Sequence, residues 1–473
     1  MSSENTEKKP QEAETNMDPD TLSFSRAHPG WEEHLLLLIQ DKNKEQLQQF
    51  FKDLYPADIG YLLERQDLED ALYIYEQLDS ESRGEVLLEV NETLRNKIME
   101  TISPTEMAEI VLEQESDAAA DILEGLKDEH VSEILSYMPI GDRVKITELL
   151  SYSENAAGSL MGKEFAAVLE TDTVQKAIQT LRKISKNTDD IYTVYVVDGS
   201  GKYKGHISLK NLIIANPRVK VKKIMESEIL PIPVSMDREE VANFFDRYNF
   251  VTAPVVDANG IMIGRITVDD IIDVIQEEAS EDILRMGGLS SDETLNSPIF
   301  LSSLKRATWL SVNLCTAFLA AFVIKSFQAT IEQVVILSAL MPIVAGMGGN
   351  AASQSMTIII RNIALGEVSS SNIFRIFKRE AFLGLINGLA MGTLTGLGVL
   401  LFTGSSALSG VIAAAMIFNL LVAAVSGTLV PIVLDRIQID PAIASSIFVT
   451  TFTDVVGFTI FLGFAYLAMP YLL

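Results

Sequence analysis

The chain has 473 residues and a formal net charge of −27, yet 48% of its residues are hydrophobic. The charge is unevenly distributed, because residues 301–473 contain 8 basic and 6 acidic residues, whereas residues 1–300 contain 29 and 58. An acidic, water-soluble portion is therefore joined to an apolar one. The acidic portion lacks the basic face that a nucleic-acid-binding protein needs, so nucleic acid is excluded as a partner.

The available side chains also exclude several kinds of chemistry. The only cysteine, Cys315, lies in an apolar stretch, and the four histidines are scattered through the acidic portion. They supply no disulfide framework, soft-metal site or histidine-based triad, and the sequence has no P-loop, nucleophile elbow or HExxH motif. We therefore do not expect an enzyme.

The N-terminal 155 residues divide into a tail and a helical domain. Residues 1–30 are polar and lack the apolar segment of a signal peptide, which predicts a disordered tail. Residues 31–155 contain short helical units that open with Ser or Asp, as at Ser80 and Ser103, and predict an all-α superhelix. Within it, Asp117 and Asp121 are four residues apart and share a helix face.

An internal repeat follows, because the segment from Val196 resembles the segment from Val255 at an offset of 59 residues. Each copy predicts a strand, a glycine turn, a second strand and a Ser or Thr that caps a helix. The repeat resembles an α/β tandem of CBS domains, here residues 156–268, which often binds ATP or another adenine nucleotide. This resemblance gives three candidate nucleotide-binding residues, Ser208, Asn211 and Phe250, although the family commonly has Asp where this chain has Asn211.

A long helix from Val268 is predicted to carry acidic side chains on one face and isoleucines on the other. At 100° per residue its acidic face contains Asp270, Asp273, Glu277 and Glu281, widened by Glu278 and Asp282. Two such charges ~4 Å apart repel by ~4 kcal/mol at an effective dielectric constant of ~20. A divalent cation with a preference for oxygen ligands, such as Mg²⁺, would relieve the repulsion. The alternative is a merely solvated helix face.

Five membrane-spanning helices are the simplest interpretation of the apolar portion. Residues 307–324 and 333–360 are uncharged, 381–434 is long enough for two helices divided at 404–410, and 441–473 contains one charge. Basic residues flank the first span and fill the loop after the second, which places both on the cytosolic side. The N-terminal domains are then cytosolic and the C-terminus lies outside.

Two spans contain many small residues. The third has glycines at a four-residue repeat, which predicts close contact with another helix: Gly384, Gly388, Gly392 and Gly396. The second combines Pro342, Gly346, Gly348, Gly349 and Asn350 within nine residues. So many helix-breaking residues predict a loosened backbone along a water-filled path, and the alternative is a kink that serves packing.

Asp454 is the most informative single residue of the apolar portion. It follows Asp440 by 14 residues, which is ~21 Å along a helix and places it near the middle of the bilayer. A carboxylate there costs roughly 2.5–3.5 kcal/mol, and no Lys or Arg lies in the middle of a span. A cation from solution is the natural partner. The alternative is a protonated Asp454 bonded to nearby threonines, namely Thr450, Thr451 or Thr453.

The order of these parts resembles the MgtE family of magnesium transporters from about residue 30 onward. The motifs that carry the resemblance are AAGSLM at 156–161, the CBS repeats, DDIIDVIQEEASED at 269–282, PIVAGMGGNAASQS at 342–355 and DPAIASSIFVTTFTD at 440–454. The resemblance implies the following multidomain order: helical domain 31–155, CBS pair 156–268, connecting or plug helix 269–297 and α-helical transmembrane bundle 298–473.

The resemblance also implies a homodimeric, Mg²⁺-selective, channel-like transporter in the cytoplasmic membrane, which closes when cytosolic Mg²⁺ is plentiful. The implied pore residues are Asp454, Gly346, Gly349, Asn350 and Thr450. The implied sensing residues are Asp117, Asp121, Asp270, Asp273, Glu278, Glu281 and Asp282. Two other functions remain open: a broader divalent carrier for Co²⁺ or Mn²⁺, and a membrane-anchored Mg²⁺ or nucleotide sensor that conducts nothing.

Overall fold

The computed structural model describes residues 35, 37–39, 44–52, 54–185, 191–227, 230–291, 293 and 297–472, without the side chains of 443–446. The predicted tail at 1–30 lies outside this range. The chain divides into two compact units. One contains Met1–Met236 and Thr252–Ile266, and the other contains Asp237–Val251 and Thr267–Leu473.

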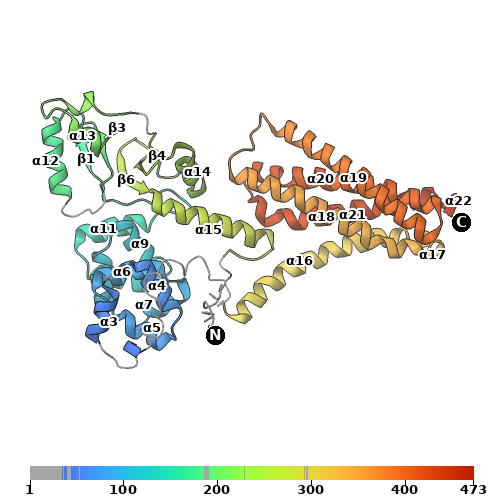
Figure 1. Ribbon diagram of the computed structural model, residues 1–473, viewed down its shortest axis with the longest axis horizontal. Helices are drawn as coiled ribbons and strands as arrows, with labels where there is room; N and C mark the ends of the chain where they lie inside the picture. The colour runs from blue at the N-terminus through green and yellow to red at the C-terminus, as the bar shows by residue number, and fades with distance from the viewer. Residues whose placement is uncertain are drawn as a thin grey trace, which may run out of the picture. The chain divides into compact units, whose positions relative to one another are not determined.

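The first unit begins with a stack of short helices around one apolar core (Figure 1). The helices are α3 (Lys44–Phe51), α4 (Pro56–Glu64), α5 (Leu68–Tyr75), α6 (Ser80–Glu89), α7 (Glu92–Met99), α8 (Pro104–Leu112), α9 (Ser116–Leu123), α10 (Asp128–Ser136) and α11 (Ile140–Leu149). Ser103 caps α8, since its hydroxyl accepts a hydrogen bond from the Glu106 N–H at 3.2 Å. In α6 the cap is Asp79, one residue before the predicted start. The all-α N-terminal region is confirmed.

Two small three-stranded sheets follow in the same unit. The first contains β1 (Ala167–Leu169), β2 (Thr193–Val197) and β3 (Tyr203–Ser208), with α12 (Val174–Ile184) before β2 and α13 (Leu209–Ile214) after β3. The second contains β4 (Ile232–Pro233), β5 (Thr252–Val256) and β6 (Met262–Thr267). In both sheets the first pair of strands is parallel.

The glycine turns of the two repeats have the conformation that only glycine adopts without strain. Gly201 and Gly260 have φ values of +83° and +78°. The turns also pair with each other, because the Tyr203 N–H donates to the Gly260 carbonyl at 3.1 Å and the Met262 N–H donates to the Gly201 carbonyl at 3.1 Å. The predicted order of strand, turn, strand and capped helix is therefore confirmed.

The second unit contains α14 (Arg238–Tyr248), α15 (Val268–Met286) and the apolar helices (Figure 1). Five helices are long and apolar enough to cross a membrane: α16 (Ile299–Ser326), α18 (Ile336–Ala364), α19 (Ile373–Thr403), α20 (Ser406–Arg436) and α21 (Pro441–Leu467). The short helices α17 (Gln328–Gln333) and α22 (Met469–Leu472) complete the unit. The predicted five-helix bundle is confirmed.

The glycine repeat of α19 faces α20, as the spacing predicts. Gly384, Gly388, Gly392 and Gly396 are all buried. An ideal Cβ on Gly388 would lie 2.9 Å from the carbonyl oxygen and 3.0 Å from the Cα of Ile417. Only hydrogen fits at this position, so the glycines allow the two backbones to touch.

The predicted loosening of the second span is wrong. The helix α18 is continuous from Ile336 to Ala364 and contains Pro342 within it. A proline removes one intrahelical hydrogen bond, and neighbouring helices can compensate for that loss. Gly348 is buried against a side chain of α20, whereas an ideal Cβ on Gly346 or Gly349 would meet nothing within 4 Å. At Gly348, therefore, the small residue serves packing.

Candidate ion pathway and acidic regulatory helix

Asp454 lies in the middle of α21, which spans 27 residues. The helix begins where Pro441 follows Asp440, whose Oδ1 accepts a hydrogen bond from the Ala442 N–H at 2.7 Å. Asp454 is half-buried. The hydroxyls of Thr451 and Thr453 donate to the Ile447 and Thr450 carbonyls at 2.7 and 2.9 Å. These two hydroxyls donate to the backbone and can still accept a hydrogen bond, so the alternative of a threonine-bonded, protonated Asp454 stays open.

The other predicted pore residues lie on α18 and α21, two helices that pack against each other. Gly346 and Asn350 are exposed on the surface of this bundle, and Gly349 is half-buried. Thr450 is exposed one helical turn before Asp454. A path that used all of these residues would therefore run along the surface of this bundle.

Thr450, a predicted pore residue, lies near the C-terminal end of the acidic helix. It lines a cavity of about 370 Å³, whose walls also include residues at the C-terminal end of α15 and residues of α16. The remaining lining residues are Met286, Gly287, Gly288, Leu289, Arg306, Trp309, Leu310 and Asn313. A movement of the end of α15 would therefore change the surroundings of a predicted pathway residue.

The first predicted sensing residue of α15 caps the helix. Thr267 and Asp270 form a capping box, in which Asp270 Oδ2 accepts hydrogen bonds from the Thr267 N–H at 3.3 Å and from its hydroxyl at 2.7 Å. One turn later, partial desolvation and the charge of Asp269 raise the pKa of Asp273. Of the isoleucines expected on the opposite face, only Ile271 is buried, and the others are exposed: Ile272, Ile275 and Ile283.

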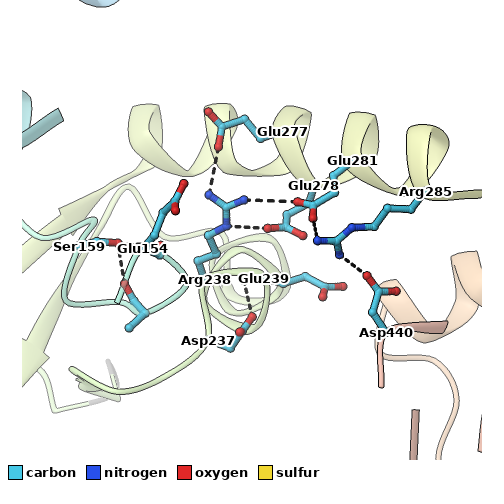
Figure 2. A network of polar contacts seen from close by, with 11 residues as sticks. Glu154, Ser159, Asp237, Arg238, Glu239, Glu277, Glu278, Glu281, Arg285 and Asp440 are labelled. Carbon is cyan, nitrogen blue, oxygen red and sulfur yellow. Dashed lines mark hydrogen bonds and ion pairs between the residues drawn. The ribbon is translucent and has the colours of Figure 1, made fainter. Parts of the chain in front are cut away.

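Arg238, the first residue of α14, partly neutralises the acidic face (Figure 2). Its guanidinium lies 2.6 Å from Glu278, 3.2 Å from Glu277 and 3.8 Å from Glu281. The Arg238 side chain is 13% exposed, so these ion pairs are shielded from water on the arginine side. The arginine therefore holds α14 against α15 and supplies charge compensation that the sequence interpretation assigned to metal ions alone.

Arg285, on the last turn of α15, extends the network toward the membrane helices. Its guanidinium pairs with Glu281 and with Asp440, the residue that caps α21 (Figure 2). A chain of charged contacts therefore runs from α14 through α15 to the helix that carries Asp454. Sequence spacing could have identified the Glu281–Arg285 pair, because the two residues are four apart on one helix.

The carboxylates around these arginines are still in excess. Burial, followed by the charges of Asp440 and Glu278, raises the pKa of Asp282 to about 6. Burial also raises the pKa of Glu239 to about 7, with smaller contributions from Glu278, Asp282, Asp237 and Asp440. A cation close to these two carboxyls would lower their pKa values, because it would offset the cost of ionisation. Among the described residues, no group of three or more His, Cys, Asp or Glu side chains is placed to hold a metal ion.

Asp117 and Asp121 lie on α9, in the first unit, whereas the acidic face of α15 belongs to the second. Asp117 is half-buried beside Gly162, whose ideal Cβ would lie 2.6 Å from Asp117 Oδ2, and Asp121 is exposed. A sensing site that combines both helices stays a prediction. In the first unit, α9 is held by ion pairs that the sequence interpretation missed.

One of these contacts joins Arg265 of β6 to Glu115, the residue before α9, at 2.7 Å. Another centres on Glu164, which accepts hydrogen bonds from the Ser116 hydroxyl and N–H at 2.6 and 3.1 Å and pairs with Lys145 at 3.0 Å. The helical domain and the strands that follow it are therefore joined by direct side-chain contacts within this unit.

The candidate nucleotide-binding residues already have partners. The Ser208 hydroxyl caps α13 by accepting from the Asn211 N–H at 3.3 Å, and the Asn211 amide donates to Glu226 at 2.7 Å. Phe250 stacks on Tyr248 with ring centroids 5.6 Å apart. Phe250 belongs to the second unit and the other two residues to the first, so a shared nucleotide site stays a prediction.

The described part of the chain has five apolar helices, a carboxylate in the middle of one of them and a charged network that reaches its capping residue. These features define a multi-pass membrane protein of the cation-transporter class with appended N-terminal domains. Comparisons with known families agree. The MgtE model, described as a divalent cation transporter, matches residues 341–464, and the model of the MgtE intracellular N domain matches 54–155. The CBS domain model matches 157–217 and 221–277.

Named relatives cover nearly the whole chain. The magnesium transporter MgtE of Thermus thermophilus is 31% identical over 91% of this chain and 99% of its own length. That of Enterococcus faecalis is 30% identical over 93% and 98%. The chain belongs to the MgtE family. These relatives are named as transporters, which confirms that the protein is a transporter rather than an enzyme.

One solved structure that resembles the chain is the cytosolic domain of the Mg²⁺ channel MgtE in complex with ATP. It is 30% identical, covers 51% of this chain and 98% of its own, and has a TM-score of 0.48. A second, the soluble part of a magnesium transporter, is 28% identical with the same TM-score and covers 52% of this chain.

Proposed function

We propose that the protein is a channel-like, Mg²⁺-selective transporter of the cytoplasmic membrane, in which Asp454 meets the ion and the acidic face of α15 closes the path. The observation that carries the proposal is the position of Asp454 at the centre of α21, whose first turn is joined to α15 through Asp440 and Arg285. The relatives named as magnesium transporters support the choice of ion.

The proposed path lies between two copies of the chain. Gly346 and Asn350 are exposed on the bundle surface, and a two-fold axis beside them would bring two Asp454 carboxylates toward one path. Because Mg²⁺ loses its water reluctantly, the carboxylates and nearby backbone carbonyls would contact the ion through its hydration shell. The basic residues beside the first two spans orient the protein so that the N-terminal domains are cytosolic and the C-terminus lies outside.

Closure is a competition between Mg²⁺ and the two arginines. At low cytosolic Mg²⁺, Arg238 and Arg285 balance only part of the charge of the surrounding carboxylates. Asp282 and Glu239 are the carboxyls whose pKa is raised by burial and by neighbouring carboxylates. Mg²⁺ bound between these carboxylates would favour the arrangement of α15 that closes the path. A ligand shifts such an equilibrium only by its differential affinity for the two states, and several weak sites together provide a steep response.

Two further binding roles are part of the proposal. Asp117 and Asp121 would contribute further ligands for Mg²⁺. An adenine nucleotide would bind the CBS pair near Ser208, Asn211 and Phe250.

The first experiment is Mg²⁺ flux into liposomes that contain the full-length protein, with Mg²⁺ varied independently on each side. We expect flux that falls when millimolar Mg²⁺ is present on the cytosolic side. An Asp454→Asn variant should lose at least ~90% of the flux, since a neutral amide removes the negative charge that attracts the hydrated cation to the middle of the membrane. Asp435→Asn, an exposed charge at the end of α20, is the matched control and should conduct normally.

Three outcomes would count against the proposal. Undiminished flux in Asp454→Asn would remove this residue from the path. Equal flux of Co²⁺ or Mn²⁺ in competition would support a broader divalent carrier. Absence of flux under every condition, with folding intact, would favour a non-conducting sensor.

A further inference from the structure

A buried asparagine in α20 occupies an unusual position in the membrane bundle. Asn419 has 0% exposure and is the only asparagine among the buried polar residues of the described chain. Its Nδ2 donates a hydrogen bond to the Val344 carbonyl of α18 at 2.8 Å. Its Oδ1 is buried and has no hydrogen-bond partner among the described residues. A buried carbonyl without a donor is unfavourable, so stability alone does not account for an amide here.

Two glycines make room for this amide. An ideal Cβ on Gly348 of α18 would lie 2.5 Å from Asn419 Nδ2, and one on Gly457 of α21 would lie 2.7 Å from Asn419 Oδ1. For each glycine, the three nearest heavy atoms all belong to Asn419. The amide therefore fits between the backbones of α18 and α21, and a methyl group at either glycine would collide with it.

The two glycines are next to the proposed ion path. Gly457 follows Asp454 by three residues, which is about one helical turn, and Gly348 lies between Gly346 and Asn350. The side chain of Asn419 thus touches both of the helices that carry the proposed pathway residues, although it belongs to a third helix. Its hydrogen bond to the Val344 carbonyl fixes the amide against α18.

We infer that Asn419 is a positioning residue for transport, which sets the spacing of α18 and α21 at the level of Asp454. The inference rests on the proposed function of Asp454 in the ion path. Asn419 contacts no ion in this role. It acts through the backbones at Gly348 and Gly457, and therefore determines how wide the path is and which hydrated cation passes.

The test is a double-mutant cycle between Asn419 and Gly348, read as Mg²⁺ flux in liposomes and as the ratio of Mg²⁺ to Co²⁺ flux. Gly348→Ala should reduce Mg²⁺ flux about tenfold, because the methyl group pushes the amide and α18 apart. Asn419→Ala should alter the flux ratio. The double variant should recover about fivefold or more of the flux lost in Gly348→Ala, because removal of the amide leaves space for the methyl group.

Two additions show whether the contact itself, rather than a general loss of folding or of conduction, explains the result. The cycle is repeated with Gly457→Ala, which approaches the same amide from α21, and both cycles are also read as the midpoint of thermal unfolding in detergent. Gly463→Ala is the control on α21, since its ideal Cβ meets nothing within 4 Å. This variant should conduct and unfold as the parent protein does.

Flux losses that simply multiply in the double variants, together with shifts of the thermal midpoint that simply add, would overturn the inference. So would an unchanged flux ratio in Asn419→Ala. All variants of the cycle retain Asp454, so a failed cycle leaves the assignment of Asp454 intact. Normal flux in Asp454→Asn would reject the path assignment without changing the outcome of the cycle.

Discussion

The substitution Arg238→Gln should loosen α15 in the absence of Mg²⁺ and increase the response of this helix to Mg²⁺. In the parent protein the guanidinium contacts Glu277, Glu278 and Glu281, and the shortest N–O distance is 2.6 Å. At this distance and an effective dielectric constant of ~20, one pair gains ~6 kcal/mol from Coulomb attraction alone. Desolvation of both charges opposes most of that gain.

The exposure of the three carboxylates sets the expected net effect. Their side chains are 62%, 27% and 16% exposed, so solvent screening lowers the cost of losing the arginine well below that of a fully buried pair. We expect about 2 kcal/mol, which is roughly a thirtyfold change in the equilibrium that holds α15 against α14. Loss of one positive charge also makes the acidic face more attractive to a divalent cation.

Hydrogen exchange followed by mass spectrometry on the full-length protein in lipid nanodiscs measures both effects. In chelator, the amides of Val268–Met286 should exchange about thirtyfold faster in Arg238→Gln than in the parent protein. Added Mg²⁺ should remove most of the difference, with half-maximal protection at a lower Mg²⁺ concentration in the variant. Ionic strength is kept constant with a monovalent salt.

The matched control is Arg247→Gln, which changes an exposed arginine on α14, the helix that also contains Arg238. This variant should leave the exchange of α15 unchanged. Equal exchange of Arg238→Gln and the parent in chelator would refute the structural role of Arg238. Faster exchange with an unaltered Mg²⁺ dependence would refute the competition between the arginine and the ion.

Two further predictions concern stability. Burial opposes ionisation of Glu164, but hydrogen bonds from Ser116 and the charge of Lys145 outweigh it and lower the pKa below 4.5. The ionised form therefore stabilises the first unit at neutral pH, and this contribution is lost as the pH falls through the folded-state pKa. Glu164→Gln should lower the urea midpoint at pH 7 by the equivalent of about 1–2 kcal/mol, and a difference that persists well below pH 4.5 would contradict the assignment. Gly388→Ala should cost roughly 1–3 kcal/mol by thermal unfolding in detergent, because its methyl group meets the Ile417 backbone, whereas Gly398→Ala meets nothing within 4 Å and should be neutral or stabilising. Equal midpoints for these two variants would remove the proposed contact of α19 with α20.

The features that the sequence predicted correctly depend on residues close together in the chain. The strand, turn and capped helix of each repeat follow from local residue preferences and from glycines such as Gly201 and Gly260, where φ is positive. The five long helices follow from apolar length alone. The four-residue glycine spacing of α19 shows which face is small, because helical geometry fixes which residues share a face.

Other features depend on which surfaces meet after folding, and periodicity does not contain that information. The sequence shows that α15 has an acidic face, but only the folded chain places Arg238, about 40 residues away, against that face. The glycine-rich stretch of α18 predicted a loosened backbone, whereas the helix is continuous where it packs against its neighbours. A single asparagine in an apolar run gave little signal, and its contacts with Gly348 and Gly457 arise only because three helices converge at one depth. Secondary structure is set by local preferences, whereas the partner of a buried polar group is set by tertiary packing.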